Sequence, residues 1–185
     1  MREATRSDRL HAIESRYAVD EAASDEQFLA AAKLYAREIV ARFGLSVSVS
    51  ALSWAVSTRA KRRAGAVKHR EGSPETVSLT RQYFETKGWS SMAAIVRHEL
   101  IHVHLLNEMD DGGHGEQFHA LAEELHAPRH CERFAEPSWW VVCTGCPTRI
   151  PRYRRSKLVT HPEEYACGNC GGGFRVETTD TRTES

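Results

Sequence analysis

The sequence predicts an α+β protein built from one larger domain and one small cysteine module. Up to about residue 136, segments with strand-like alternation lie between segments whose apolar residues recur at helical spacing. After residue 136, the chain consists of short apolar stretches and paired cysteines. At 185 residues and 41% hydrophobic, the chain can bury one core and a small satellite, but not two large domains. We therefore expect a peripheral segment over 1–23, the main domain over 24–136, the module over 137–176 and a disordered tail over 177–185.

The first helix of the main domain is predicted between Ser24 and Gly44. Ser24 is a typical N-cap, apolar residues then recur at helical spacing, and Gly44 is a typical C-terminal stop. Residues 1–23 are charged and show only weak helical patterning, so we expect a frayed or peripheral helix there.

A small antiparallel sheet is expected between this helix and the next one. Apolar residues alternate with small polar ones from Leu45 to Val56, which is typical of strands with one buried face. The run from Arg59 to Val67 predicts a basic hairpin. After the turn at Gly72–Pro74, Val77 and Leu79 fit a third strand.

The most informative segment is His98-Glu-Leu-Ile-His102, on a predicted amphipathic helix capped by Ser90 or Ser91. Residues four apart share a helix face, so the two histidines can present their imidazoles to one zinc ion. Glu99 is turned by about 100° around the helix axis and is placed to act on a water molecule instead. This pattern predicts a hydrolytic zinc site with Glu99 as the general base.

The third protein ligand decides the class of such a site, because a catalytic zinc has three ligands and an open position. One known spacing requires a histidine where this chain has Glu108. A glutamate on a following helix is an alternative, and Glu123 or Glu124 lies near the required separation. We favour His114, because it stands between two glycines, where the backbone can approach the metal helix closely. The other histidines nearby, His104, His119 and His126, are expected to lie away from the metal.

Two Cys-x-x-Cys pairs predict a second zinc site, which is structural. The pairs are separated by 20 residues, the spacing of a zinc ribbon. Four thiolates close the tetrahedron, so folding of the module should depend on the metal. The fifth cysteine, Cys131, is interpreted as a small apolar residue. The predicted ligands are Cys143, Cys146, Cys167 and Cys170.

Basic and aromatic residues of the module predict a nucleic-acid contact. Basic side chains bind phosphates, and aromatic rings stack on bases. A solvated charged hairpin is the alternative for the basic strip, and packing of the module against the main domain is the alternative for one tryptophan. The candidates are Trp139, Trp140, Arg149, Arg152, Tyr153, Arg154, Arg155 and Lys157.

The formal net charge is zero, but two basic blocks flank an acidic middle over 82–136. No apolar run approaches the roughly 20 residues that span a bilayer, and the N-terminus lacks the apolar stretch of a signal peptide. We therefore expect a soluble, cytoplasmic, nucleoid-associated protein with no membrane partner. The residues leave the oligomeric state open, and a monomer is the expectation.

Together these features resemble the SprT-like metalloproteases, the group that includes the DNA-dependent protease Spartan. The matching elements follow one another over most of the chain. They are the helix ending near Gly44, Trp54 with Ala64-Gly65 after it, the HELIH segment, Gly113-His114-Gly115 with Phe118, the pair Trp139-Trp140, and the four cysteines.

The resemblance implies a zincin-like domain with a catalytic zinc on His98, His102 and His114, with Glu99 as the base. It also implies a structural zinc in a ribbon that binds DNA. The implied task is proteolysis of DNA-bound or DNA-crosslinked proteins, activated by DNA with single-stranded character. The loop from His102 to His114 is shorter than in Spartan, so a different substrate shape is expected. In its compact form the chain resembles the prokaryotic members. A long partner-binding tail is not expected.

The leading hypothesis is therefore a zinc metalloprotease that its basic segments bring to DNA. The alternative is a non-enzymatic nucleic-acid-binding zinc protein, with a role in transcription as one version of it. Glu99 favours the enzyme, because a pure scaffold has no need for a carboxylate at the water-activating position.

Overall fold

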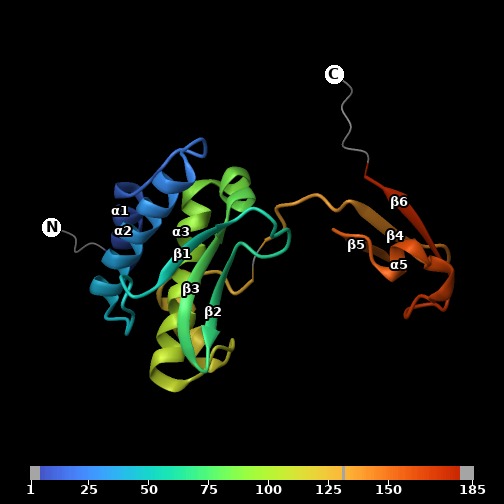
Figure 1. The fold of residues 1–185 in the computed structure, drawn as a ribbon. Coiled ribbons are helices and arrows are strands. Elements are labelled where there is room, and N and C mark those ends of the chain that lie inside the picture. Colours follow the sequence, from blue (N-terminus) through green and yellow to red (C-terminus); the bar gives the residue numbers. More distant parts are fainter. Residues whose placement is uncertain (1–4, 131, 180–185) are drawn as a thin grey trace. The chain divides into compact units, whose positions relative to one another are not determined.

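The computed structural model describes residues 5–130 and 132–179, and it consists of two units. The first unit ends at Phe134 and the second begins at Ala135. Both contain helices and a small sheet, which confirms the predicted α+β class (Figure 1). Cys131 and the last six residues of the expected tail, 180–185, lie outside the described residues.

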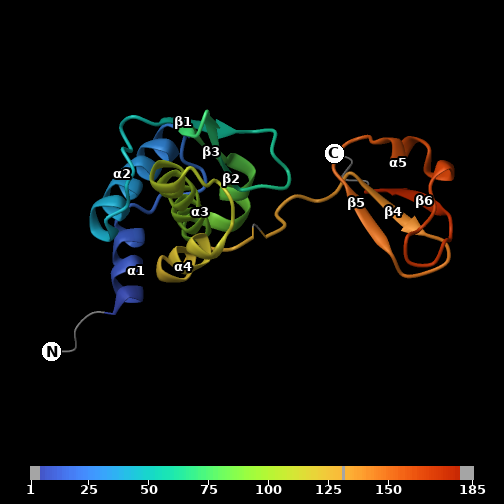
Figure 2. The ribbon, with the colours of Figure 1, turned by 90° about the horizontal axis from the view of Figure 1, so that it is seen from below.

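The first unit is a mixed sheet covered on one face by helices (Figure 2). Helices α2 and α3 pack against the strands and against each other, so the core lies between the sheet and these two helices. The elements are α1 (Arg6–Arg16), α2 (Asp25–Phe43), β1 (Ser53–Ser57), β2 (Gly65–Arg70), β3 (Ser73–Thr80), α3 (Arg81–Met109) and α4 (Glu116–Glu124).

Helix α2 begins and ends where the sequence predicts. Ser24 and Gln27 form a reciprocal capping box, and Gly44 adopts the left-handed conformation with φ 67°. The helix expected before it is present, and it is capped rather than frayed. Helix α1 has its own capping box at Thr5, and its apolar residues Leu10 and Ile13 are buried. Only a few of its positions reach the core, which explains the weak periodicity.

The strand order is β1-β3-β2, and here the predicted antiparallel pairing was partly wrong. β2 and β3 form an antiparallel hairpin, but β1 pairs with β3 in parallel. The loop after β1 carries the chain to the far edge, and the hairpin then returns β3 into the middle. Glu71 and Gly72, both with positive φ, form a two-residue turn that suits this hairpin. Residues Leu45 and Val49 are buried but do not form the expected strand.

Helix α3 is longer than predicted, because it starts at Arg81 rather than near Ser90 or Ser91. It contains one break, at Gly88, whose φ of 76° and ψ of 179° are not helical. Only glycine adopts this backbone conformation readily. The segment after the break, which begins at Trp89, carries the HELIH residues.

The second unit is a three-stranded antiparallel sheet with the order β5-β4-β6. Strand β6 runs to Thr178, which lies in the range expected for the tail. Within the described residues, no helix of either unit is long and apolar enough to cross a membrane. The elements of this unit are β4 (Trp139–Cys143), β5 (Arg149–Arg152), α5 (Lys157–Thr160), the 3-10 helix η1 (Pro162–Glu164) and β6 (Phe174–Thr178).

Candidate metal centre and active site

Three histidines of the first unit converge on one point. His98 and His102 lie on successive turns of α3, and His114 lies in the loop before α4. Nε2 of His98 is 3.1 Å from Nε2 of His102 and 3.3 Å from Nε2 of His114. Two nitrogens bound tetrahedrally to zinc at about 2.0–2.1 Å would lie about 3.3 Å apart, so the donors fit such an ion.

The backbone orients two of these rings from behind. Nδ1 of His98 lies 2.7 Å from the carbonyl oxygen of Pro128, and His102 hydrogen-bonds to the backbone of Gly112. A carbonyl can only accept, so Nδ1 of His98 carries the proton and Nε2 is left with its lone pair. Histidine ligands are commonly held by such a partner on the other ring nitrogen.

The histidines are neutral at neutral pH, which is the form that binds metal. Burial lowers the pKa of His98, and burial together with the neighbouring histidines lowers the pKa of His102 to about 4. Burial also lowers the pKa of the more exposed His114.

The carboxyl group of Glu99 lies in the same cleft as the histidines. Its side chain is buried, and it accepts a hydrogen bond from the backbone N–H of Val67 in β2. Burial raises its pKa to about 8, although the positive charge of Arg63 and the Val67 hydrogen bond act in the opposite direction. A carboxyl with a pKa near neutral pH can both accept and return a proton.

Phe118 of α4 packs against all three imidazoles. Its ring centroid lies 4.9 Å from that of His98, 4.7 Å from that of His102 and 4.4 Å from that of His114. The phenyl ring is fully buried and restricts the rotation of the histidine rings. The sequence indicated Phe118 as part of the resemblance to a known family, not as a contact of the histidines.

The model of the SprT-like family matches residues 28–136, which include all three histidines and Glu99. The chain belongs to the SprT-like family.

Several curated relatives support this assignment. A "Protein SprT-like" of Geobacillus sp. (strain WCH70) is 34% identical over 109 residues, which cover 55% of this chain and 68% of that protein. A "Protein SprT-like" of Bacillus velezensis is 30% identical, covering 56% of this chain and 70% of that protein. One of Streptococcus sanguinis is 32% identical over 96 residues. The family match ends before the first cysteine of the second unit.

The alternative third ligands of this SprT-like unit lie elsewhere. Among the described residues, His98, His102 and His114 form the group of the first unit that can hold a metal ion. Glu124 forms an ion pair with Arg6 at 2.8 Å, and Glu108 lines a different cavity. His104 is turned away, as predicted, and its Nδ1 accepts a hydrogen bond from the N–H of Ser46.

An open cavity of about 520 Å³ lies over the histidines and Glu99. One side is strand β2, and the other is the segment after α4. The sequence did not predict that basic residues line this cavity. The sequence shows the basic run that includes Arg62 and Arg63, but it does not show that this run lies beside the histidines. Arg129 and His130 follow a turn whose position no local pattern predicts.

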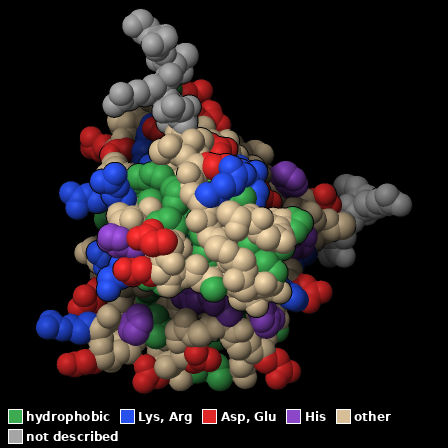
Figure 3. Space-filling view, turned by 90° about the vertical axis from the view of Figure 1, so that its right-hand side faces the viewer, with side chains coloured by type: hydrophobic (Ala, Val, Ile, Leu, Met, Phe, Trp, Pro, Cys, Tyr) green, Lys and Arg blue, Asp and Glu red, His purple; other side chains and the backbone are tan. Residues whose placement is uncertain are grey.

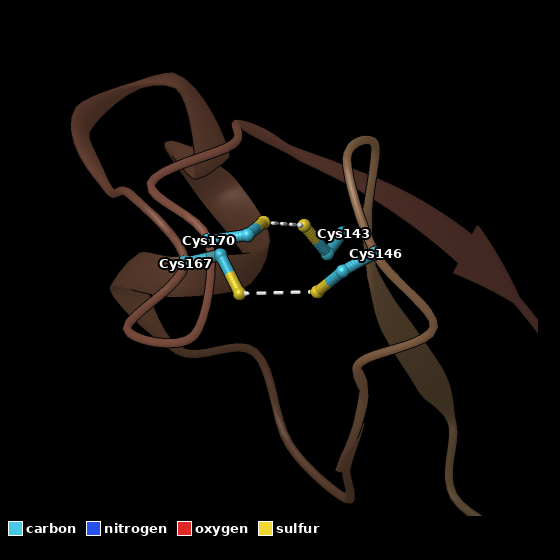
Figure 4. Close-up of side chains that lie close together, drawn as sticks. All are labelled: Cys143, Cys146, Cys167 and Cys170. Atoms are coloured by element: carbon cyan, nitrogen blue, oxygen red, sulfur yellow. Dashed lines mark hydrogen bonds between the residues drawn. The ribbon is translucent and has the colours of Figure 1, made fainter.

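The second unit holds the four predicted cysteine ligands around one point (Figure 4). Sγ of Cys143 is 3.4 Å from Sγ of Cys170, and Sγ of Cys146 is 3.7 Å from Sγ of Cys167. Thiolates bound tetrahedrally to zinc at about 2.3 Å lie about 3.8 Å apart, so four sulfurs fit a metal ion. The backbone N–H of Asn169 lowers the pKa of Cys167 to about 6, which favours its thiolate form.

The predicted DNA-binding residues of the second unit fall into two groups. Some contact other residues of the unit. The guanidinium of Arg149 lies 4.8 Å from the ring centroid of Trp140 and pairs with Glu177 at 3.0 Å. Arg152 donates to the carbonyl of Pro151, and Tyr153 is half-buried, as is Trp139. The second group is exposed and consists of Arg154, Arg155 and Lys157.

The segregation of charge along the sequence does not keep opposite charges apart in the structure. On the face in Figure 3, Lys and Arg side chains stand among Asp and Glu side chains. Ion pairs join opposite charges within and between these segments, for example Lys87 with Glu132 at 3.1 Å and Arg81 with Glu85 at 2.8 Å.

Proposed function

We propose that this SprT-like protein is a zinc metalloprotease that cleaves DNA-bound proteins. The observation that carries the enzymatic part is the placement of Glu99. Its carboxyl lies in the cleft beside three convergent imidazole nitrogens, and its pKa is close to neutral pH. A site that only stabilised the fold would have no use for this carboxyl.

The ligands of the catalytic zinc would be His98, His102 and His114, and the open cleft leaves room for water and substrate. Zinc in such a site supplies Lewis acidity toward a water molecule and a substrate carbonyl. Glu99 would accept the proton of the attacking water and return it to the leaving amine. The Val67 N–H holds the carboxylate in place during both transfers.

The neighbouring strand supports a peptide substrate. β2 is an edge strand of the sheet β1-β3-β2, and residues Gly65 to Val67 line the cavity. An extended peptide can add to such an edge through main-chain hydrogen bonds, largely independent of its sequence. This mode would lay the scissile bond of a substrate beside the histidines and Glu99.

DNA is proposed as the partner because the second unit combines aromatic and exposed basic side chains. Arg154, Arg155 and Lys157 are exposed and follow strand β5, and Trp140 lies in the neighbouring strand β4. Basic side chains bind phosphates without sequence preference, and aromatic rings stack on unpaired bases. This supports DNA with single-stranded character as an activator.

The test is cleavage of a DNA-bound protein by the full chain, with and without single-stranded DNA. The wild type should cleave the bound protein, and faster with DNA. Glu99→Gln should bind two metal equivalents and not cleave. Native-rate cleavage by the Gln variant would refute the assignment of the base. Absence of cleavage under every condition, with DNA binding intact, would favour the non-enzymatic alternative.

A further inference from the structure

Arg97 is a buried charge that the proposed chemistry does not use. Its side chain is 6% exposed and lies on α3 directly before His98. Nη1 lies 3.1 Å from the carboxylate of Glu14, on α1, which is itself buried. A buried ion pair generally adds little to stability compared with apolar residues of similar size. A role for Arg97 therefore depends on the hydrogen bonds of its guanidinium group.

The guanidinium joins three separate parts of the first unit. Besides its contact with Glu14, Nη1 donates to the hydroxyl of Tyr35 on α2. Nη2 donates to the backbone carbonyl of His126, in the turn after α4, at 3.2 Å. The planar fork of arginine can hold several acceptors in fixed directions at once.

The turn held by Arg97 is the one that orients His98. His126 has a positive φ of 48°, a conformation that residues other than glycine rarely adopt, so the turn is specifically shaped. Two residues later, the carbonyl of Pro128 accepts the hydrogen bond of His98 Nδ1 at 2.7 Å. Two neighbouring residues of α3, Arg97 and His98, thus bind two carbonyls of the same turn.

We propose that Arg97 is a positioning residue of the metal centre. By holding the His126 carbonyl, it fixes the turn 126–128, and the Pro128 carbonyl then keeps the His98 ring with Nε2 toward the other two histidines. Partners behind a metal ligand typically raise metal affinity by roughly 10- to 100-fold. The inference rests on the proposed metal centre but not on protein cleavage.

The same contacts make α1 a support of the metal helix. The carboxylate of Glu14 also accepts a hydrogen bond from Ser90, and the Glu14 carbonyl accepts one from Trp89 Nε1 at 2.8 Å. Both donors lie at the start of the α3 segment that carries the histidines. Helix α1 therefore contacts the start of the histidine-bearing segment of α3 directly, and it contacts Arg97 through Glu14.

The test compares Arg97→Lys with Arg16→Lys in the full chain. Lysine keeps the charge beside Glu14, but its single ammonium group cannot reproduce the three contacts of the fork. Arg16 is the matched control, because it pairs α1 with Glu38 of α2 at 2.8 Å on the surface, away from the turn. Both variants are titrated with zinc against a competing chelator. Long-range proton–nitrogen NMR spectra of the metal-free proteins report the tautomer of His98.

Arg97→Lys should weaken one of the two zinc equivalents by roughly 10- to 100-fold and leave the other, in the cysteine cluster, unchanged. Its His98 should change from a single Nδ1–H tautomer to a mixture. Arg16→Lys should match the wild type in both measurements. A folded Arg97→Lys variant with wild-type zinc affinity and a single His98 tautomer would overturn the proposal.

A second variant covers the case in which Arg97→Lys does not fold. Glu14→Gln combined with Arg97→Met removes both buried charges together, so neither is left unpaired. It should fold and show the same selective loss of zinc affinity. If it folds and binds both equivalents normally, or if neither variant folds, Arg97 has only a structural role. A wild type that binds no metal at the histidines would refute the metal centre itself, whereas one that binds metal without cleaving protein would refute only the protease.

Discussion

Gly65 and Glu99 are in such close contact that a side chain on residue 65 would displace the Glu99 carboxyl group. A Cβ placed there would lie 2.5 Å from Oε1 of Glu99 and 2.8 Å from the side chain of Ile95. The Glu99 carboxyl group therefore lies against the backbone of Gly65 at the start of β2, closer than a residue with a Cβ would allow. This contact explains why a small residue stands at the point where the edge strand passes the active-site helix.

Replacing Gly65 by alanine should lower protein cleavage strongly without removing the metal. The added methyl displaces the Glu99 carboxyl, and a misplacement of about 1 Å can reduce turnover roughly 100-fold. The measurement is kcat on a DNA-bound protein together with the zinc content. Gly168→Ala is the control, since a Cβ there meets no atom within 4 Å. Equal kcat values for Gly65→Ala and the wild type would contradict the prediction.

His114→Ala should reduce the zinc content of the full chain from two equivalents to one. Removal of one of three convergent imidazoles leaves only His98 and His102, and two ligands hold zinc weakly. The bound metal is counted by mass spectrometry under non-denaturing conditions. His104→Ala is the matched control, because this histidine contacts the backbone of Ser46 instead and should keep both equivalents. Retention of both by His114→Ala would exclude it as a ligand.

Removal of metal should unfold the second unit and leave the helices of the first unit largely intact. The sheet of the second unit has few fully buried apolar residues, among them Val141, and its turns are held by the cysteine cluster. The core of the first unit is formed by larger side chains such as Phe28 and Phe84. A chelator titration followed by NMR should show amide signals of β4 collapsing before those of α2. Simultaneous loss of both sets would argue against this order.

Replacing Arg154 and Arg155 together by glutamine should weaken DNA binding similarly for all sequences. Loss of two phosphate contacts should also reduce the salt dependence of the binding constant, by roughly one unit of slope per contact. Fluorescence anisotropy with single-stranded DNA at several salt concentrations measures both effects. Arg175→Gln serves as the control, because Arg175 already pairs with Glu177 at 2.8 Å. Unchanged DNA binding by the double variant would indicate that the basic residues from Arg59 to Arg63, before β2, bind DNA instead.

The free energy of unfolding of the first unit should fall at alkaline pH, because the phenol of Tyr35 is buried. Burial raises its pKa from the ordinary value of 10.0 to about 12. Between these values the unfolded chain releases the phenol proton while the folded chain keeps it, so the free energy of unfolding falls with rising pH. The slope approaches about 1.4 kcal/mol per pH unit. Below pH 10 the phenol is neutral in both states, and no such loss occurs.

The matched variant for this prediction is Tyr35→Phe, which has no phenol to ionise. Urea unfolding of both proteins at about pH 9, 10 and 11 gives the difference in their free energies. The free energy of unfolding of the wild type, relative to that of Tyr35→Phe, should fall between the two higher pH values. A constant difference over the whole range would show that the phenol does not titrate on unfolding.

Local patterns predicted a large part of the fold correctly. The N-cap at Ser24, the stop at Gly44 and the apolar spacing between them depend on interactions within one helix, so they can be read from consecutive residues. The same holds for HELIH, because residues four apart on any α-helix share a face. The cysteine pairs predicted the cluster of the second unit for a similar reason, since each pair lies on one tight turn.

Other features were not predictable from local patterns. The parallel pairing of β1 with β3 depends on where a loop carries the chain, and the alternation of apolar residues is the same for either pairing. The burial of α1 depends on partners far along the chain, as Glu14 and Arg97 show. The helical segment from Arg81 to Lys87 was missed, because the predicted helix began at Ser90 or Ser91, after Gly88, and a glycine inside a helix is locally unfavourable.

The sequence by itself determined the kinds of donor atom, their spacing on α3 and in the two cysteine turns, and the α+β class. Covalent order and helical geometry are sufficient for these features. Only the tertiary structure decided that His114 approaches His98, that Gly65 confines Glu99, and that Arg97 holds the turn behind the metal centre. These relationships join residues that are distant along the chain, and their distances are set by the packing of whole elements against one another.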